Sequence, residues 1–118
     1  MIDKTDNSGR IPLHWACSTG IVKVSIALIE KGTNVRARDK AGLTPLHLAC
    51  RYGHDEVAMK LIESGADIGA RDKEGVTPLH LACHCGLSEV AHTLVRKNGE
   101  LVHVKDRVRQ SSFDNPNP

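Results

Sequence analysis

Several side chains capable of metal binding or catalysis lie close together in the second half of the chain. His80, Cys83, His84 and Cys85 fall within a short segment, and His92 follows it. On a helix, His80 and His84 would share a face, and two imidazoles at that spacing can hold a zinc ion. Histidine and cysteine also serve nucleophilic catalysis, provided that a nucleophile, a base and an orienting group converge.

The histidines, however, recur at a fixed interval along the chain. His14, His47 and His80 are each 33 residues apart and follow a proline by two positions. Repetition of this kind favours a structural role, and we expect these side chains to make hydrogen bonds within a helical turn. His84 and Cys85 alone provide too few ligands for zinc. The sequence therefore predicts no metal site, no cofactor and no enzymatic activity.

The cysteines follow the same interval, at Cys17, Cys50 and Cys83. On packed helices their Cα atoms would be about 8 to 10 Å apart, whereas a disulfide requires roughly 7 Å or less. We expect these three thiols to be reduced and buried as small hydrophobic groups. Cys85 differs, because it aligns with Tyr52 at the end of a helix, and we expect it to be an exposed, reactive thiol.

The interval also governs the sequence around the histidines. Thr44–His47 reads Thr-Pro-Leu-His, as does Thr77–His80, and Ile11–His14 is a variant. Glycines and aspartates repeat in the same register, at Gly9, Gly42 and Gly75, at Gly20, Gly53 and Gly86, at Gly32 and Gly65, and at Asp6, Asp39 and Asp72. The chain closely resembles the ankyrin-repeat family in both period and motif. The resemblance implies an all-α solenoid of three helix-turn-helix units with β-hairpin-like finger loops.

Local sequence signals agree with that unit. Thr44 can cap a helix that begins at Pro45, where the missing amide is harmless, and Gly53 can end it. A second helix is expected to begin near Asp55, whose charge suits a helix N-terminus, and residues 66–75 are expected to form a finger with a turn at its tip. Ile11 cannot cap by its side chain, which should cost the first helix about 1 kcal/mol.

The register divides the chain into three repeats, at about 6–38, 39–71 and 72–105, within a repeat domain of residues 1–106. One additional residue near Lys97 shifts the register from 33 to 34. Residues 107–118 are expected to be the degenerate start of a fourth repeat or a disordered tail. We expect Phe113 to pack on the apolar face of the third repeat.

Composition is that of an ordinary globular protein, with 40% hydrophobic and 25% charged residues and a formal net charge of +2. No apolar stretch approaches the roughly 20 residues of a membrane-spanning helix. We expect a soluble protein of the cytoplasm or nucleus. Neither end of the array has the polar face of a capping repeat, so the chain is expected to be a monomer or to self-associate end to end.

The positions that differ between repeats indicate where a partner could bind, because they are not needed to maintain the fold. In the ankyrin-repeat family these positions line a concave surface that binds proteins, so the resemblance implies a protein-protein interaction module of the scaffold or adaptor type. The candidate binding residues at the finger tips are Arg10, Lys40, Ala41, Leu43, Lys73, Glu74 and Val76. Among them, Leu43 and Val76 are expected to be exposed apolar side chains that add contact area. The candidates at the ends of the first helices are Ser18, Thr19, Arg51, Tyr52, His84 and Cys85.

Two alternatives remain open at this stage. The fingers are rich in basic residues that could bind nucleic acid, although the small net charge argues against it. These residues are Arg36, Arg38, Lys40, Arg71, Lys73, Lys105, Arg107 and Arg109. The chain could also be a regulatory ankyrin segment of a larger protein.

Overall fold

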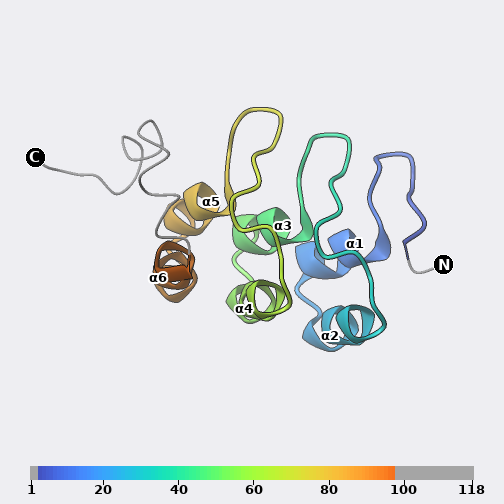
Figure 1. Ribbon diagram of the computed structural model, residues 1–118, viewed down its shortest axis with the longest axis horizontal. Coiled ribbons are helices and arrows are strands. Elements are labelled where there is room, and N and C mark those ends of the chain that lie inside the picture. The colour runs from blue at the N-terminus through green and yellow to red at the C-terminus, as the bar shows by residue number, and fades with distance from the viewer. Residues whose placement is uncertain (1–2, 98–118) are drawn as a thin grey trace, which may run out of the picture.

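The computed structural model describes residues 3–97, which form six α-helices arranged in two rows (Figure 1). The inner row consists of α1 (Pro12–Thr19), α3 (Pro45–Arg51) and α5 (Pro78–His84), and the outer row of α2 (Val22–Glu30), α4 (Asp55–Glu63) and α6 (Ser88–Lys97). Neighbouring helices pack within each row, and the two helices of each repeat pack on one another. The all-α repeat architecture expected from the sequence is confirmed for these residues.

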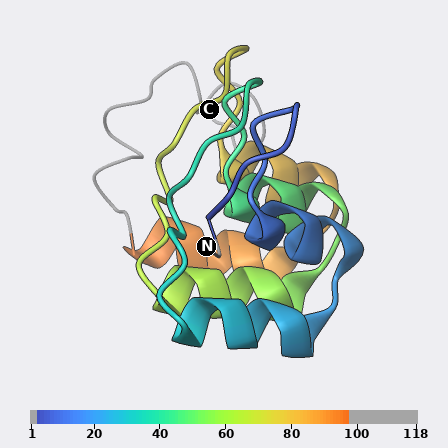
Figure 2. The same ribbon diagram turned by 90° about the vertical axis from the view of Figure 1, so that its right-hand side faces the viewer.

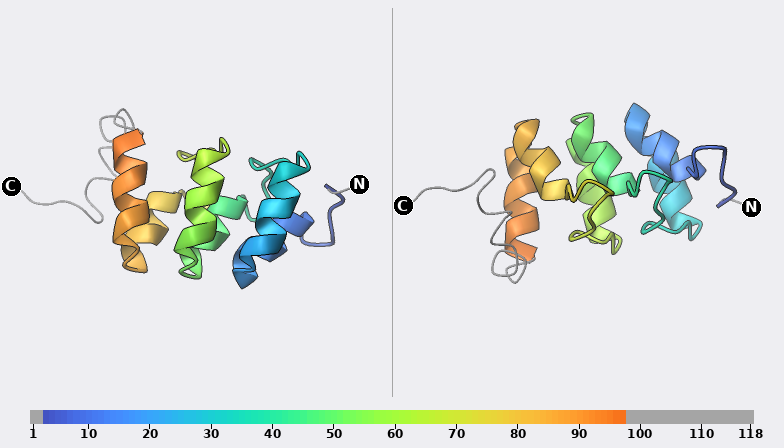
Figure 3. Two further views of the ribbon diagram at one scale, coloured as in Figure 1. Left: turned by 90° about the horizontal axis from the view of Figure 1, so that it is seen from below. Right: turned by 90° about the horizontal axis from the view of Figure 1, so that it is seen from above.

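Three loops project from the inner row and lie side by side, as the view from the N-terminal end shows (Figure 2). We call them finger 1 (residues 3–11), finger 2 (residues 31–44) and finger 3 (residues 64–77). Seen from below, the outer helices lie in front of the inner ones (Figure 3). The fingers and the inner row therefore form one side of the solenoid, and the outer row forms the other.

Each inner helix begins as the sequence predicts. The Thr44 side-chain oxygen accepts a hydrogen bond from the His47 amide at 3.2 Å, and the Thr44 amide donates to Nδ1 of His47 at 3.1 Å. Thr77 and His80 repeat the arrangement. This reciprocal capping satisfies amides that the first turn of a helix leaves without intrahelical acceptors. The expected role of these histidines within the turn is confirmed.

The first helix retains only half of this cap. The Ile11 amide donates to Nδ1 of His14 at 3.1 Å, but the Ile11 side chain makes no capping hydrogen bond. Instead, the Ile11 side chain is buried in the hydrophobic core, with 3% of its surface exposed. Burial of an isoleucine stabilises the fold by about 1.5 to 3 kcal/mol, so it offsets the lost cap.

An aspartate organises the tip of each finger. Oδ1 of Asp39 accepts hydrogen bonds from the amides of Ala41 and Leu43, both at 2.9 Å, and Asp72 and Asp6 do the same in their own fingers. Within residues 3–97 no β-strand forms, so the β-hairpin-like geometry expected of the fingers is not confirmed. The turns are Asx turns, which an aspartate side chain stabilises.

Neighbouring finger tips approach closely. The Lys40 amide donates to the Ser8 carbonyl at 3.0 Å, and the Lys73 amide donates to the Ala41 carbonyl at the same distance. Gly42 lies beside this contact with φ at 83°, and a Cβ there would lie 3.0 Å from the Lys73 nitrogen. The glycine is therefore needed both for its backbone conformation and for the close approach of the next finger.

The same histidines also join one repeat to the next, which the sequence analysis did not predict. Nε2 of His14 lies 2.9 Å from the Leu43 carbonyl oxygen, and Nε2 of His47 lies 2.8 Å from the Val76 carbonyl oxygen. A carbonyl can only accept, so Nε2 carries the hydrogen and Nδ1 remains free to accept from the capping residue. Burial lowers the pKa of both histidines, which keeps them in this neutral form.

The buried cysteines are only partly as predicted. Cys17 and Cys50 are fully buried, and burial raises the pKa of each thiol to about 12. Cys83 was expected to match them but is only half-buried. The reason is that Cys50 lies between two repeats, whereas no repeat follows Cys83 within residues 3–97. The predictions for Phe113 and for residues 107–118, and the end of the third repeat beyond Lys97, lie outside the described residues.

We predict that Thr44→Val destabilises the protein by about 1 to 2 kcal/mol, because it removes the capping oxygen while preserving side-chain shape. Equilibrium urea unfolding measures the change. Thr5→Val is the matched control, since Thr5 is exposed and caps no helix. An equal loss in both variants would contradict the capping role.

We also predict that stability falls between about pH 7 and pH 5. Because burial lowers the pKa of His14 and His47, the unfolded chain binds protons more readily at these residues than the folded chain does. Their contribution is complete above the unfolded pKa of about 6.5 and is lost as the pH falls toward the folded value, by at most about 1.4 kcal/mol per pH unit for each proton bound.

Urea unfolding at several pH values tests this expectation. His47→Gln should reduce the slope of stability against pH, and His92→Gln, a change at an exposed histidine of α6, is the matched control. The contribution of Asp39 is distinct. Burial alone would raise its pKa, but hydrogen bonds from the Leu43 amide and the Arg10 side chain outweigh burial and lower it, so its contribution is lost only below about pH 4. A flat profile from pH 7 to 5 would refute the role assigned to the histidines.

Candidate functional site

A hollow of about 410 Å³ opens between the second and third repeats, on the finger side of the inner helices. It is bounded by the ends of α3 and α5 and by fingers 2 and 3. Its lining residues are Leu43, Arg51, Tyr52, Asp72, Glu74, Val76, Leu81, His84 and Cys85. We call this set the concave hollow.

The concave hollow combines an apolar floor with a polar rim. Leu43 is buried, and Val76 and Leu81 are half-buried, so aliphatic groups form its base. Tyr52 stands at the rim with 53% of its surface exposed. Arg51 is exposed at the end of α3, and Glu74 is exposed on finger 3. A hydrophobic base is thus bordered by an exposed aromatic ring and by charges of both signs.

Cys85 connects the two helix ends that bound the hollow. Its thiol donates to the Arg51 carbonyl oxygen, with a distance of 3.1 Å from Sγ to the oxygen. Cys85 is nevertheless exposed, as the sequence predicts. The contact orients the thiol across the joint between α3 and α5 and leaves one side of it facing the hollow.

Two predicted site residues are less accessible than expected. Leu43 and Val76 were expected to be exposed at finger tips, but Leu43 is 5% exposed and Val76 is half-buried. The expectation for Leu43 was wrong because the aspartate turn directs the chain back toward the inner helices, so the side chain of Leu43 joins the hydrophobic core. Both residues contribute to the floor of the hollow.

Three further predicted residues lie apart from the concave hollow, in the first repeat. Arg10 forms an ion pair with Asp39, with 3.0 Å between Nε and Oδ2, and its guanidinium lies 4.9 Å from the centre of the Trp15 ring. Ser18 and Thr19 donate their hydroxyl hydrogens to the Trp15 carbonyl. These contacts give all three residues structural roles.

The remaining predicted residues, Lys40, Ala41 and Lys73, are exposed at the finger tips. Their backbones form the contacts between fingers described above, and their side chains point away from the core. They lie beyond the lining of the concave hollow, on the surface that extends from it along the fingers.

Sequence reasoning missed Asp72, Leu81 and Trp15. Asp72 was recognised only as a repeated position, yet it lines the hollow. Trp15 occupies the position of Leu48 and Leu81, and this difference between repeats was the signal that could have identified it. Its indole N–H donates to Oδ2 of Asp6 at 2.8 Å. Hydrogen bonds from the Arg10 amide and from Trp15 lower the pKa of Asp6 well below its usual range.

The described residues lack the features of two other classes of site. Among residues 3–97, no cluster of three or more histidine, cysteine or acidic side chains is arranged to bind a metal ion. In the same range, none of the helices combines the length and the apolar character needed to cross a bilayer.

We predict one fast-reacting thiol in the part of the chain described above. Cys85 should react rapidly with a thiol reagent such as Ellman's reagent, and Cys85→Ser should abolish the fast phase without lowering the melting temperature. Cys17 and Cys50 should react only on unfolding, because they are buried and hold their protons. Cys50→Ser is the matched control. A fast phase that persists in Cys85→Ser would contradict this assignment.

Comparison with known proteins agrees with the geometry. The family model described as Ankyrin repeats (3 copies) matches residues 1–72 and residues 28–106. No curated protein sequence matches the chain. The two matched ranges overlap and together include every helix described here. Proteins built from these repeats are generally modules for protein-protein interaction. The chain belongs to the ankyrin-repeat family.

Proposed function

We propose that the chain is a scaffold or adaptor module that binds a protein partner through the concave hollow and the adjoining finger tips. One observation carries this proposal. Positions that differ between the repeats in sequence converge in space: Arg51 and Tyr52 from the second repeat lie against His84 and Cys85 from the third. Residues that vary without disturbing the fold, gathered in one hollow, suit selective recognition.

The chemistry of the hollow supports binding of a protein side chain. Tyrosine and arginine provide much of the binding energy at interfaces, because they combine a large contact area with directional hydrogen bonds. Tyr52 and Arg51 present both at one rim, while Leu43 and Val76 offer an apolar base for an inserted aliphatic or aromatic group. Asp72 and Glu74 can bind polar groups that flank it.

A catalytic role is not supported. His84 and Cys85 are adjacent in sequence, and the Cys85 thiol donates to a backbone carbonyl, whereas a nucleophilic cysteine would donate to an imidazole. His14, His47 and His80 have structural roles in capping. We therefore propose a non-enzymatic binding module, which is the general character of its family.

Nucleic-acid binding is the weaker alternative for two reasons. Some basic residues of the fingers are already used within the structure: Nε of Arg36 donates to the Gly65 carbonyl, and the Arg38 guanidinium donates to the Arg71 carbonyl. In addition, Asp72 and Glu74 place negative charge in the hollow. Phosphate binding would produce a steep loss of affinity with salt, which distinguishes the alternatives for any captured ligand.

The cysteines are relevant to the cellular compartment in which the module is found. Cys17, Cys50, Cys83 and Cys85 form no disulfide within the described residues, and reduced thiols persist in compartments that are kept reducing. We therefore propose a cytoplasmic or nuclear location.

We predict that Arg51→Ala combined with Tyr52→Ala weakens partner binding by about 2 to 4 kcal/mol, because the change removes both rim anchors. A partner is first isolated by affinity capture with the native chain, and its dissociation constant is then measured by calorimetry. Circular dichroism should be unchanged, since both side chains are exposed.

The matched control changes the opposite side of the same repeat. Lys60→Ala combined with Glu63→Ala on α4 removes two charged side chains and should leave affinity within about 0.5 kcal/mol of the native value. If the α4 variant binds as poorly as the α3 variant, the concave hollow is not the binding surface.

A further inference from the structure

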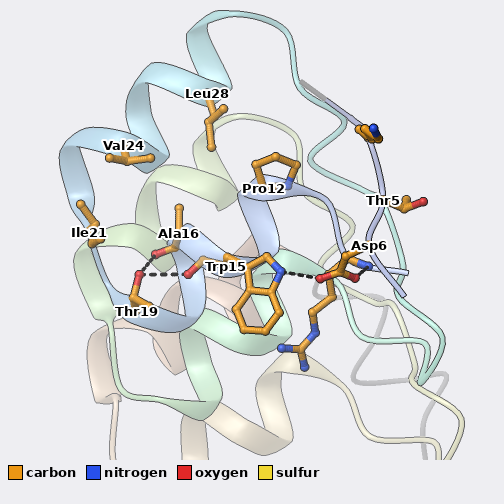
Figure 4. A pocket seen from close by; sticks show the side chains of 11 residues that line it. Thr5, Asp6, Pro12, Trp15, Ala16, Thr19, Ile21, Val24 and Leu28 are labelled. Atoms are coloured by element: carbon orange, nitrogen blue, oxygen red, sulfur yellow. Dashed lines mark hydrogen bonds between the residues drawn. The ribbon is translucent and has the colours of Figure 1, made fainter. Parts of the chain in front are cut away.

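The N-terminal end of the solenoid carries a second hollow, which the proposed function does not use. Its volume is about 930 Å³. Pro12, Ala16, Val24 and Leu28 contribute apolar groups to it, and Trp15 also lines it (Figure 4). We call this surface the leading face. Val24 is 46% exposed and Ile21 is 50% exposed, which is unusual for aliphatic side chains on a repeat protein with buried joints.

The equivalent residues of the other repeats show what the leading face is shaped to contact. Val57 and Val90 occupy the position of Val24, and they are 1% and 0% exposed. Leu61 and Leu94 occupy the position of Leu28 and are also buried. In these repeats the surface is covered by the preceding repeat, because α2 packs on α4 and α4 packs on α6. The leading face is therefore one half of the joint that the chain forms twice internally.

The other half of the joint is found on the third repeat. His47, Cys50 and Ile62 are buried at the joint between the second and third repeats. Their equivalents His80, Cys83 and Val95 are only half-buried. We call the surface that contains these three residues the trailing face. Its composition matches the surface that the second repeat already presents to the third.

The backbone at the tip of finger 1, on the leading face, also complements the backbone at the tip of finger 3, on the trailing face. At each internal joint the amide of Lys40 or Lys73 donates to the finger before it. The equivalent amide on finger 1 belongs to Asn7, which donates to no acceptor within residues 3–97. The equivalent acceptor on finger 3 is the Glu74 carbonyl, which accepts no backbone hydrogen bond in the same range. The leading face thus offers a donor and the trailing face an acceptor.

The hydrogen bond from a histidine Nε2 to the carbonyl of the next finger also has a donor on the trailing face and an acceptor on the leading face. His80 occupies the position of His14 and His47, but within residues 3–97 its Nε2 makes no hydrogen bond. The Leu43 carbonyl accepts one bond from its own finger and a second from His14. The Arg10 carbonyl, its equivalent on finger 1, accepts only the bond from Asp6 in the described part of the chain. It retains one lone pair for an incoming N–H.

We propose that the trailing face binds the leading face of a second copy of this chain, in place of the contact with Phe113 expected from the sequence, so that the two copies stack head to tail. The joint would continue the interface that the chain already forms between its own repeats. Nε2 of His80 in one copy would donate to the Arg10 carbonyl of the other, and the Asn7 amide would donate to the Glu74 carbonyl. Because the two faces differ, the contact is heterologous and can extend beyond a dimer.

Two leading faces would not complement one another equally well. The internal joints pair a leading with a trailing surface, so two leading faces would bring neither a Glu74 carbonyl to the Asn7 amide nor Nε2 of a His80 to the Arg10 carbonyl. Trp15 is compatible with the head-to-tail arrangement. Its equivalent Leu81 lines the concave hollow at an internal joint, and the indole N–H of Trp15 is hydrogen-bonded to Asp6 on finger 1.

Sedimentation velocity of the full chain, from micromolar to millimolar concentration, tests this proposal. The native chain should sediment faster as its concentration rises. Val24→Asp should weaken association at least about tenfold, because it places a charge in an apolar joint, and Val95→Asp should weaken it comparably from the other face. An equimolar mixture of the two variants should recover a dimer but no larger species, since each copy retains one intact face.

Lys23→Glu is the matched control. Lys23 is exposed, as are its equivalents Glu56 and Glu89, so this position lies outside the joint. Circular dichroism confirms that each variant folds. A native chain that stays monomeric throughout the range would overturn the proposal. Association that survives in Val95→Asp but not in Val24→Asp would overturn it too, because it would indicate that two leading faces pair.

Discussion

The bond from each buried imidazole to the carbonyl of the next finger is the constraint on which the rest of this structure depends. One ring nitrogen of His47 caps its own helix through Thr44, and the other reaches the Val76 carbonyl of finger 3. A single neutral side chain therefore fixes where an inner helix begins and how the next repeat sits upon it. Because both ring nitrogens of His47 are hydrogen-bonded, neither can bind a metal ion or act in catalysis unless a contact that holds the helix cap or the next repeat is broken. In His14 and His47 the ring nitrogens are thus committed to the architecture, whereas in His80 only Nδ1 is committed in this way within residues 3–97.

The position of the concave hollow follows from the same joint. The carbonyl that accepts from the histidine belongs to the residue just before the next cap, which the aspartate turn has already brought toward the helices. This places Val76 at the base of the hollow and leaves the ends of α3 and α5 at its rim. Shape is supplied by positions that all repeats share, and chemical character by Arg51, Tyr52, His84 and Cys85, which differ. A binding surface can change in such a protein without any change in its joints.

The sequence was sufficient to predict the features that depend on a single repeat. The threonine cap, the proline that follows it and the glycine turns are local, so the beginnings of α3 and α5 could be predicted residue by residue. Burial could not, since it depends on which neighbour covers a residue. Leu43 and Cys83 show the two errors: Leu43 was expected at an exposed tip and is buried by the return of the finger, and Cys83 was expected to match Cys50 although no repeat follows it within residues 3–97. The contact of Trp15 with Asp6 and Arg10 joins a helix to a finger, and a substituted leucine position was the only indication of it.

The backbone hydrogen bonds between neighbouring fingers have a consequence for how such a chain can change in length. Each joint uses the same donors and acceptors, so removal of residues 39–71 would bring the Lys73 amide to the Ser8 carbonyl and His14 to the Val76 carbonyl, with no new chemistry required. A deletion that changed the spacing between two finger tips would instead displace Gly42 relative to the neighbouring backbone, which lies 3.0 Å from the position of a Cβ. Whole repeats can therefore be gained or lost as intact units without any change in the contacts between fingers.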